Sequence, residues 1–495
     1  MADAPLRRPK LVGADVEVPL VNGELRRYVN LDYAASTPAM SAALECVNRF
    51  APYYSSVHRG AGFKSQVSTA AYESARGLLL EFFGGRPGDV AIFTRNTTDA
   101  VNLLATCLPS GTSVLTFGSE HHANLLPWRR AGLKTVSLPI PSSAAQAVDS
   151  LEAALKSDTG ADLAAVTGAS NVTGELWPIR ELAEVVHRHG ARILLDAAQT
   201  APHRSVSLSD LDVDYLVVSA HKMYAPFGVG LLAGRADWLE QGEPYLRGGG
   251  AVDFVTEASV QWTDLPARQE AGSPNVIGAV AFAAAVSELQ AYGMEQVWIE
   301  EQKQAARVRR VLAQIPGVRV YLLWPEAEER TGVVTFNVDG YDHSLVAAVL
   351  SAEYGIGVRH GCFCAHPLML HLLELPSREV EAIRDRLRSN DNRRVPGAVR
   401  LSLGLGTTEA ELDYFLDSVR SLVADGPRAK YELDPRTGDY QLADDARRPE
   451  ALATSLIGAT TPRGTSVVAS NASGWRRQLS VPTKRRPGLE EATDV

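Results

Sequence analysis

Two charged residues follow two apolar runs of the sequence and could take part in one reaction. Asp196 comes directly after Ile193-Leu194-Leu195, and Lys222 ends the segment Ser219-Ala220-His221-Lys222, which follows Tyr215-Leu216-Val217-Val218. In open α/β sheets, ligands bind beyond the carboxyl ends of the strands. A lysine there can form a Schiff base with a carbonyl cofactor, and a carboxylate can pair with a protonated pyridine nitrogen. Alone, Lys222 is typical of a surface charge and Asp196 of a helix N-cap; together they favour a pyridoxal 5′-phosphate (PLP) site.

Such a site also needs a cradle for the phosphate. Asn96-Thr97-Thr98-Asp99 follows the strand-like run Val90–Thr94 and precedes an apolar helical segment. The free N–H groups and the dipole of a helix N-terminus bind anions, and the hydroxyl groups of Thr97 and Thr98 would add donors. Ordinary N-capping by threonine is the competing interpretation.

A pair of histidines follows a third apolar run. Glu120-His121-His122-Ala123-Asn124 comes after Val114–Phe117. An imidazole can stack on a pyridine ring and can shuttle protons. Adjacent histidines can equally be metal ligands, but no other group of His and Cys residues has suitable spacing, so we expect no metal site.

These motifs occur in the order found in the class V aminotransferase family, which the sequence resembles from about residue 28 to 423. Members of this family are fold-type I PLP enzymes. The resemblance also rests on the segments Leu31-Asp32-Tyr33-Ala34-Ala35-Ser36, Val57-His58-Arg59-Gly60, Ser170-Asn171 and Asp196-Ala197-Ala198-Gln199. It implies that His121 stacks on the cofactor ring and that Asp196 pairs with the ring nitrogen. The other implied cofactor contacts are Asn171 and Gln199 near the phenolic oxygen, and Thr98, Ser219 and His221, beside Thr97, around the phosphate.

A cysteine-containing segment narrows the expected reaction. His360-Gly361-Cys362-Phe363-Cys364-Ala365-His366 resembles the active-site loop of the short-loop cysteine desulfurases, in the branch that includes selenocysteine lyases. The resemblance implies that Cys364 receives the sulfur of L-cysteine as a persulfide, after Lys222 removes the α-proton, and that alanine is released. Nucleophilic cysteines need a lowered pKa or a nearby base, and Arg359, His360 and His366 supply cationic or basic groups. A small apolar filler is the competing interpretation of Cys364.

The same segment departs from the family pattern. The family usually has two histidines before this cysteine, whereas this chain has Cys362-Phe363. That pair looks like the Gly-Cys-Phe-Cys segment of molybdenum-cofactor sulfurases, a related PLP family that also forms a persulfide. Sulfur transfer to an acceptor protein stays the expected chemistry, while the acceptor, the preference for cysteine over selenocysteine and the role of Cys362 stay open. The alternative function is another class V PLP activity, a C–S lyase, epimerase or aminotransferase; the intact Asp196 and Lys222 argue against a non-catalytic relative.

Two further segments complete the expected site. Arg400, in the run Ala398–Leu403, matches the family arginine that binds the substrate carboxylate, where a bidentate fork is useful; a salt bridge at a strand edge is the competing interpretation. Ala271-Gly272-Ser273-Pro274-Asn275 resembles the family segment whose hydroxyl residue reaches the cofactor phosphate of the neighbouring subunit. The resemblance therefore implies a homodimer in which each site borrows Ser273 from its partner. The other expected substrate contacts are Asn171 and Arg359.

The elements that must position these residues alternate between short apolar runs and helical patterns over about residues 70–300. The strand candidates are Val90–Thr94, Val114–Phe117, Ala164–Val166, Ile193–Leu195 and Tyr215–Val218. A helix is expected between Pro178 and Gly190. Strands that alternate with helices predict βαβ units and a mostly parallel sheet with helices on both faces. The predicted fold class is therefore α/β, a fold-type I PLP transferase with a seven-stranded-type sheet.

We expect four parts along the chain. Residues 1–27 form an N-terminal segment that packs on the small domain, 28–300 the large PLP-binding domain, 301–425 a small α/β domain with the cysteine loop, and 426–495 a mostly disordered tail. The small domain is predicted from a charged helix over about 295–314, the strand Val333–Val338, a helix over about 343–353 and a helix that a capping box of Thr408 and Glu411 opens.

The composition limits the functional classes. Hydrophobic residues make up 45% and charged residues 22% of the 495 residues, which is typical of a soluble globular protein. The net charge of −9 argues against nucleic-acid binding, because phosphate neutralisation requires a basic surface. Four cysteines are too few for a disulfide framework, and the sequence shows neither a secretory signal nor a membrane span. We therefore expect a cytoplasmic protein without a membrane partner.

Overall fold

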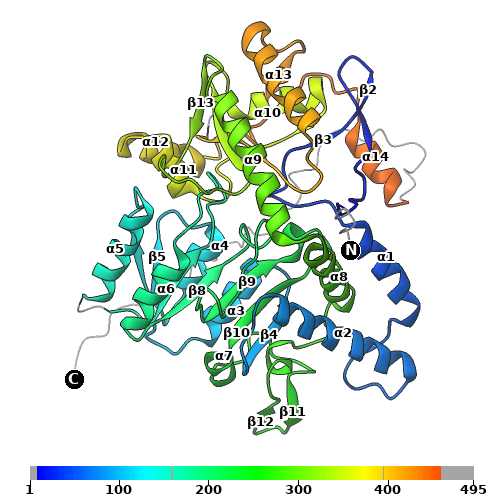
Figure 1. The fold of residues 1–495 in the computed structure, drawn as a ribbon, viewed down its shortest axis with the longest axis vertical. Coiled ribbons are helices and arrows are strands. Elements are labelled where there is room, and N and C mark those ends of the chain that lie inside the picture. The colour runs from blue at the N-terminus through cyan, green and yellow to red at the C-terminus, as the bar shows by residue number, and fades with distance from the viewer. Residues whose placement is uncertain (1–7, 158–159, 394, 459–495) are drawn as a thin grey trace, which may run out of the picture. The chain divides into compact units, whose positions relative to one another are not determined.

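The computed structural model describes residues 8–157, 160–393 and 395–458, and its large domain is built on a seven-stranded sheet (Figure 1). The strand order is β4-β10-β9-β8-β7-β5-β6. The strands are β4 (Asp89–Thr94), β5 (Ser113–Phe117), β6 (Lys134–Leu138), β7 (Leu163–Thr167), β8 (Arg192–Asp196), β9 (Tyr215–Ser219) and β10 (Gly230–Arg235). Only β10 runs antiparallel to its neighbours, β4 and β9, in this sheet. The predicted α/β fold with a mostly parallel sheet is confirmed.

Helices cover both faces of this sheet, because its strands carry apolar side chains on both sides. Along β8, Ile193 and Leu195 belong to one apolar core, whereas Leu194 belongs to another on the opposite face. The first core includes α1 (Ser41–Phe50), α2 (Phe63–Phe82), α5 (Ala144–Leu155), α6 (Ile179–Arg188) and α8 (Val276–Tyr292), and the second includes α3 (Thr97–Cys107) and α7 (Asp237–Gln241). Burial on both faces explains the uninterrupted apolar runs of the sequence.

A four-stranded antiparallel sheet forms the small domain. Its order is β13 (Val318–Tyr321), β14 (Val333–Val338), β17 (Ala398–Ser402) and β16 (Arg359–Gly361). The core on this sheet includes α9 (Met294–Leu312), α10 (His343–Tyr354) and α13 (Glu409–Asp425). The predicted capping box opens α13: the Thr408 side chain accepts from Glu411 N, and the Glu411 carboxylate accepts from Thr408 N.

The segment before residue 31 contacts the small domain. β1 (Glu17–Pro19) and β2 (Leu25–Arg27) form a hairpin, and β3 (Val29–Asn30) pairs in parallel with β15 (Ile356–Gly357). The guanidinium of Arg26 lies 3.6 Å from the ring centroid of Tyr414 on α13. These contacts bring Asp32, two residues after β3, next to Arg400 of β17.

The chain after α13 differs from the disordered tail expected from residue 426. β18 (Tyr431–Leu433) and β19 (Tyr440–Leu442) form an antiparallel hairpin. Glu353, a buried carboxylate of α10, accepts hydrogen bonds from Arg428 N at 2.9 Å, Ala429 N at 3.0 Å and the Tyr431 hydroxyl at 3.1 Å. The expectation is wrong here because polar donors, rather than apolar periodicity, attach this stretch to the small domain.

The compact unit that contains both sheets ends at Asp445. A second unit covers 446–495, of which the structure describes 446–458, with α14 (Pro449–Leu456) and no buried side chain. The rest of the predicted tail, 459–495, lies outside the described residues. No single described helix has the length and hydropathy of a membrane span; α8 and α9 reach them only as a pair that is bent by 77°.

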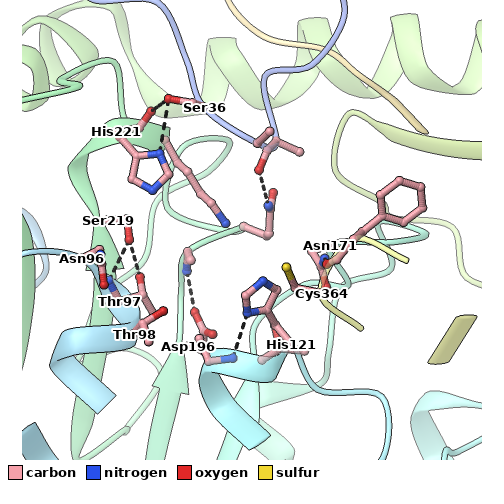
Figure 2. Close-up of a pocket in the computed structure, with 18 of the residues that line it drawn as sticks. Ser36, Asn96, Thr97, Thr98, His121, Asn171, Asp196, Ser219, His221 and Cys364 are labelled. Atoms are coloured by element: carbon pink, nitrogen blue, oxygen red, sulfur yellow. Dashed lines mark hydrogen bonds between the residues drawn. The ribbon is translucent and has the colours of Figure 1, made fainter. Parts of the chain in front are cut away.

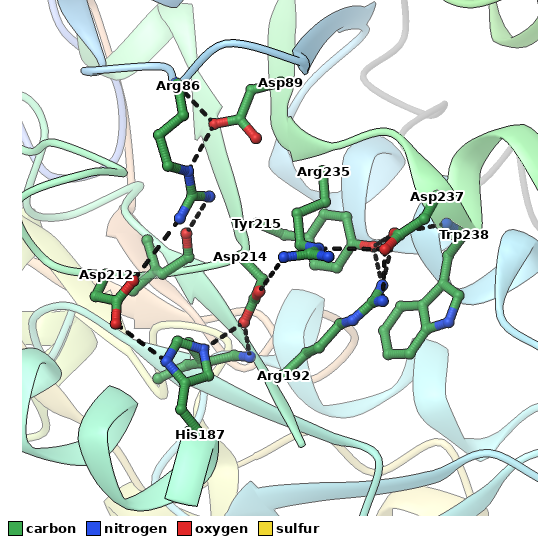
Figure 3. A network of polar contacts seen from close by, with 12 residues as sticks. Arg86, Asp89, His187, Arg192, Asp212, Asp214, Tyr215, Arg235, Asp237 and Trp238 are labelled. Carbon is green, nitrogen blue, oxygen red and sulfur yellow. Dashed lines mark hydrogen bonds and ion pairs between the residues drawn. The ribbon is translucent and has the colours of Figure 1, made fainter. Parts of the chain in front are cut away.

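Charged side chains at the amino edge of the parallel strands are paired with one another (Figure 3). His187 of α6 lies 3.2 Å from Asp212 and 2.8 Å from Asp214, just before β9. Arg192, the first residue of β8, donates to the Tyr215 hydroxyl at 3.0 Å and to Asp237 at 2.6 Å. Polar groups are thus satisfied internally at this edge, which carries none of the predicted site residues.

The hairpin contacts predict different effects for two truncations. Ending the chain after Asp445 should leave the melting temperature within about 2 °C of the full chain, because no described residue beyond it is buried. Ending it after Gly426 removes the three donors to Glu353 and should lower the free energy of unfolding by about 4–5 kcal/mol, at about 1.5 kcal/mol for each hydrogen bond to the carboxylate. Thermal and urea unfolding measure both; equal stability of the two truncations would contradict the role of the hairpin.

Candidate active site

The predicted site residues meet in one cavity at the carboxyl edge of the seven-stranded sheet, where β4, β5, β7, β8 and β9 end (Figure 2). The cavity has a volume of about 340 Å³. Gly230 opens β10 here, and a Cβ at this position would come within 2.6 Å of the Asn96 Cα, so glycine is required for the close approach of the two segments. The predicted residues that line the cavity are Thr97, Thr98, His121, Asn171, Asp196, Gln199, Ser219, His221, Lys222, Arg359, Cys364 and Arg400.

Lys222 and Asp196 share this cavity. Lys222 lies in a 3₁₀ turn directly after β9, and Asp196 is the last residue of β8. Removal of the ammonium from water lowers the pKa of Lys222 to about 8, although Asp196 offsets part of that effect. Burial raises the pKa of Asp196, whose Oδ1 accepts from Ala198 N at 3.0 Å. The pair therefore offers an amine whose pKa lies near neutral pH and a buried carboxylate that a cationic partner would stabilise.

The first turn of α3 supplies the expected anion cradle. The Asn96 side chain caps the helix by accepting from Asp99 N at 3.0 Å. The Ser219 hydroxyl accepts from Thr97 N at 2.8 Å and lies 2.7 Å from the Thr97 hydroxyl. Thr98 is exposed at the cavity wall. β4, β9 and α3 are thus tied together where N–H and hydroxyl donors surround the helix N-terminus.

His121 is held as a neutral imidazole. Its Nδ1 accepts from Ala123 N at 3.0 Å, which leaves the proton on Nε2. Burial, together with nearby Lys222, lowers the pKa of His121 to about 3. Burial and Lys222 also lower the pKa of His221 to about 4. Both rings are therefore uncharged at neutral pH and can pack against an aromatic ligand without adding charge.

Glu120 is a further site residue, whose role the sequence did not predict. Its carboxylate is fully buried, where it accepts from Asn124 Nδ2 at 2.8 Å and from Thr167 N at 3.0 Å. Burial raises the pKa of Glu120 to about 8, and the neighbouring Asp196 adds to the rise. The motif around His121 was the available signal, since Glu120 stands three residues after the apolar strand β5 and immediately before His121.

Arg400 and Gln199 present unpaired polar atoms inside the protein. Arg400 donates to Asn171 O at 2.9 Å and to Asp32 Oδ1 at 3.3 Å, while its buried Nε has no partner among the described residues. Gln199 donates from Nε2 to Ala34 O at 2.8 Å, and its buried Oε1 has no described partner either. Buried polar atoms are normally satisfied, so these two fit a site that a polar ligand completes.

Cys364 lies on a tight turn at the mouth of the cavity. Ala365 N donates to Cys362 O at 2.9 Å, and the two residues between them, Phe363 and Cys364, have φ of 54° and 55°. Two successive positive φ angles define a type I′ turn, which ordinarily requires Gly or Asn. Two distant contacts hold it here: Asn171 Nδ2 donates to Phe363 O at 2.7 Å, and His122 N donates to Cys364 O at 2.8 Å.

Asp32 and Phe363 support the predicted substrate arginine from two sides. Asp32 accepts from Arg400 and lies 3.9 Å from Arg359, and the ring centroid of Phe363 lies 5.0 Å from the Arg400 guanidinium carbon. Neither residue has a role that its sequence neighbourhood indicates, although Asp32 lies in the segment Leu31-Asp32-Tyr33-Ala34-Ala35-Ser36. Asp32 contacts Arg359 and Arg400, which lie more than 300 positions away in the sequence. Only the folded structure reveals such contacts.

Ser273 does not line this cavity. It is exposed, and its neighbours Ala271, Pro274 and Asn275 line a second cavity of about 160 Å³. The expected contribution of Ser273 to a partner's site stays a prediction, since only one chain is described. Among the described residues, no group of three or more His, Cys, Asp or Glu side chains could hold a metal ion.

Comparisons with known proteins agree with this geometry. The family model described as "Aminotransferase class-V" matches residues 29–415. A protein of Halalkalibacterium halodurans named "Probable cysteine desulfurase" is 35% identical over 359 residues, 70% of this chain and 86% of that protein. One of Haloferax volcanii named "Cysteine desulfurase" is 34% identical over 377 residues, 74% of this chain and 88% of that protein. The solved apo structure of the cysteine desulfurase from Thermococcus onnurineus is 29% identical, with a TM-score of 0.71 over 86% of this chain and 100% of that chain.

The raised pKa of Glu120 predicts how stability depends on pH. A folded-state pKa of about 8, against about 4.3 in the unfolded chain, means that the folded state binds an extra proton between these values, so stability falls as pH rises through this window. Glu120→Gln removes the titration. Its Oε1 can still accept from Thr167 N, and its Nε2 can donate to Asn124 Oδ1 once the Asn124 amide turns over, since Asn124 Nδ2 faces Glu120 in the wild type. The melting temperature of the variant should therefore fall less than that of the wild type as the pH rises from 6 to 8.

The control for this prediction is Glu181→Gln, which changes an exposed carboxylate of α6. It should keep the wild-type pH dependence. If the melting temperatures of Glu120→Gln and wild type change equally with pH, Glu120 is ionised in the folded protein and the assignment is wrong.

Proposed function

This chain belongs to the class-V aminotransferase family, and from that premise we propose that it is a PLP-dependent cysteine desulfurase, a transferase that converts L-cysteine to L-alanine and holds the sulfur as a persulfide on Cys364. The observation that carries the proposal is the presence of an amine, a carboxylate-binding group and a thiol in one cavity: Lys222, Arg400 and Cys364. The thiol is the group of the three that supplies a nucleophile for sulfur transfer.

The residues fit PLP at each of its polar groups. Lys222 would hold the cofactor through Nζ, and Asp196 would accept from the pyridine nitrogen, which relieves its burial. The N-terminus of α3 with Thr97, Thr98, Ser219 and His221 would bind the phosphate. His121 would pack on the ring, and the unpaired Oε1 of Gln199, with Asn171 nearby, would meet the polar edge of the cofactor.

When bound, PLP supplies an electron sink that acidifies the α-proton of an attached amino acid. The chain's own residues bind and orient that amino acid. Arg400 keeps a free Nε–H donor inside the protein, so a substrate carboxylate can accept from it without displacing Asp32 or Asn171. Arg359 would add a second cation at the more exposed side of the cavity. Lys222, with its pKa lowered to about 8, can accept and return a proton near neutral pH.

Cys364 would act on the substrate sulfur. Its side chain lines the cavity and is also exposed to solvent. A thiolate there can attack the substrate sulfur from one side and present the resulting persulfide to an acceptor on the other. A sulfur-acceptor protein is the partner that this exposure suits. We propose a cytoplasmic enzyme without a nucleic-acid partner, and the net charge of −9 disfavours binding to a phosphate backbone.

Removal of the amine tests the reaction class. Lys222→Ala should lower alanine formation from L-cysteine about 10³-fold or more and remove the visible absorbance of the lysine-bound cofactor. Lys303→Ala, an exposed lysine of α9, is the matched control and should behave as wild type. Product analysis decides between activities: alanine with enzyme-bound sulfur supports a desulfurase, whereas pyruvate, a D-amino acid or a keto acid without alanine would favour the alternative class V activities.

Mixing two inactive variants tests the proposed homodimer. The exposed Ser273 would reach the phosphate of the partner's site, so a bulky cation at this position should impair the partner rather than its own subunit. Lys222→Ala and Ser273→Arg should each lack activity alone. In the mixed dimer one site carries both changes and the other neither, so co-expression should restore part of the activity, about half per mixed dimer. Confirmed mixed dimers without activity, or an active monomer in sedimentation, would exclude the shared site.

A further inference from the structure

A second thiol lies beside the turn that carries Cys364. Cys362 Sγ is 3.5 Å from His366 Nδ1, and the His366 ring stacks on the His122 ring with centroids 5.1 Å apart and planes inclined by 9°. Cys362 is partly buried and does not line the cavity. We propose that Cys362 is a second sulfur carrier, which takes the outer sulfur of the Cys364 persulfide with His366 as the proton acceptor. This inference rests on the proposed function.

The turn keeps the two cysteines close together along the chain. Cys362 and Cys364 are its first and third residues, and the Ala365 N to Cys362 O hydrogen bond of 2.9 Å closes it. Two peptide units separate their Cα atoms, which therefore cannot lie more than about 7.6 Å apart. A persulfide extends the Cys364 side chain by a further S–S bond of about 2 Å. The longer side chain shortens the gap that rotation of the two side chains must close, while the turn itself stays in place.

The backbone of the turn is also held in place. Transfer of sulfur from Cys364 to Cys362 is therefore favoured over a movement of the whole loop. Left-handed φ angles at two residues that are not glycine cost about 1–3 kcal/mol each and persist only where the surroundings impose them. Asn171 and His122 impose them by donating to the carbonyl oxygens of Phe363 and Cys364. The contact of His122 N with Cys364 O also anchors the imidazole pair to the same turn.

The imidazole pair is uncharged and lies against Cys362. Burial lowers the pKa of His366, and burial together with His366 lowers the pKa of His122. His366 N and His366 Nδ1 both lie 3.3 Å from His122 Nε2. A neutral His366 in its Nε2–H tautomer, whose Nδ1 faces Cys362 Sγ, can take the thiol proton and leave a thiolate, the form that attacks sulfur.

The step balances without another reagent. His366 accepts the proton of Cys362, and the Cys362 thiolate attacks the outer sulfur of the Cys364 persulfide. The S–S bond to Cys364 Sγ breaks as the new bond to Cys362 Sγ forms, and the electron pair leaves with Cys364 as a thiolate. His366 returns its proton through solvent. One persulfide and one thiol are converted to one persulfide and one thiol, so the step requires no oxidant or reductant.

The relay predicts an order of sulfur locations. The holoenzyme is mixed with one equivalent of L-cysteine, quenched with alkylating reagent at increasing times, and analysed by peptide fragmentation, which separates the two cysteines of one peptide. In wild type the sulfur should appear first on Cys364 and then on Cys362. Cys362→Ser should still form alanine in its first turnover but keep the sulfur on Cys364, and sulfide release to dithiothreitol should fall about fivefold or more.

Two histidine variants separate proton transfer from packing. His366→Gln should slow the arrival of sulfur on Cys362 about tenfold or more, in the lower range for loss of a general base, and raising the pH should reduce the defect because solvent then removes the thiol proton. His371→Gln, an exposed histidine at the end of the same helix α11 (His366–Leu372), is the matched control and should behave as wild type. A merely structural role of His366 would give no rescue by pH.

Other results would overturn the relay. Sulfur that stays on Cys364 in wild type, with wild-type release in Cys362→Ser, shows that Cys362 is only a packing residue. Sulfur on Cys362 in Cys364→Ser shows that it is the first acceptor and reverses the order. A disulfide between the two thiols during turnover shows a dead end rather than a carrier. Failure of the proposed function is distinguishable, because it would give no alanine in wild type and sulfur on neither cysteine.

Discussion

Polar groups enclosed at the carboxyl edge of one sheet are the constraint on which the rest of the site depends. Asp196 is the last residue of β8, and Lys222 follows the neighbouring strand β9. Burial lowers the pKa of the amine and raises that of the carboxyl group, which favours the neutral form of each. Removing a charged group from water costs several kcal/mol unless a partner compensates. A ligand with a carbonyl group and a protonated ring nitrogen would compensate both. The amino edge, where His187 and Arg192 are paired, needs no such ligand.

The same requirement explains why the small domain must pack closely on the large one. Arg400 belongs to β17 of the small sheet, yet it donates to Asn171 O beside the large sheet and to Asp32 from the N-terminal segment. Asn171 also donates to Phe363 O and so fixes the cysteine turn. Three segments far apart in the sequence therefore converge on one guanidinium. A change in any of them would alter both the carboxylate site and the position of Cys364.

A feature of the fold or of the site could be predicted from the sequence when neighbouring residues determine it. The strand Val333–Val338 and the capping box of Thr408 were predictable because apolar runs and capping patterns act within a few residues. The type I′ turn was not, since Phe363 and Cys364 carry no turn signal and donors from residues 171 and 122 impose their φ angles. The hairpin after Gly426 escaped for a similar reason: its attachment to Glu353 uses backbone donors, which have no sequence signature.

A fixed turn divides the chemistry between two environments. Desulfuration needs an enclosed cavity, in which Lys222 and Arg400 are shielded from water. Transfer needs a thiol that an acceptor can reach. A flexible loop could serve both needs by moving, but a turn whose carbonyl oxygens are held by Asn171 and His122 cannot. Cys364 therefore stands at the boundary, lining the cavity while exposed to solvent. Exchange with Cys362, which does not line the cavity, would then take the sulfur off Cys364 while the backbone stays in place.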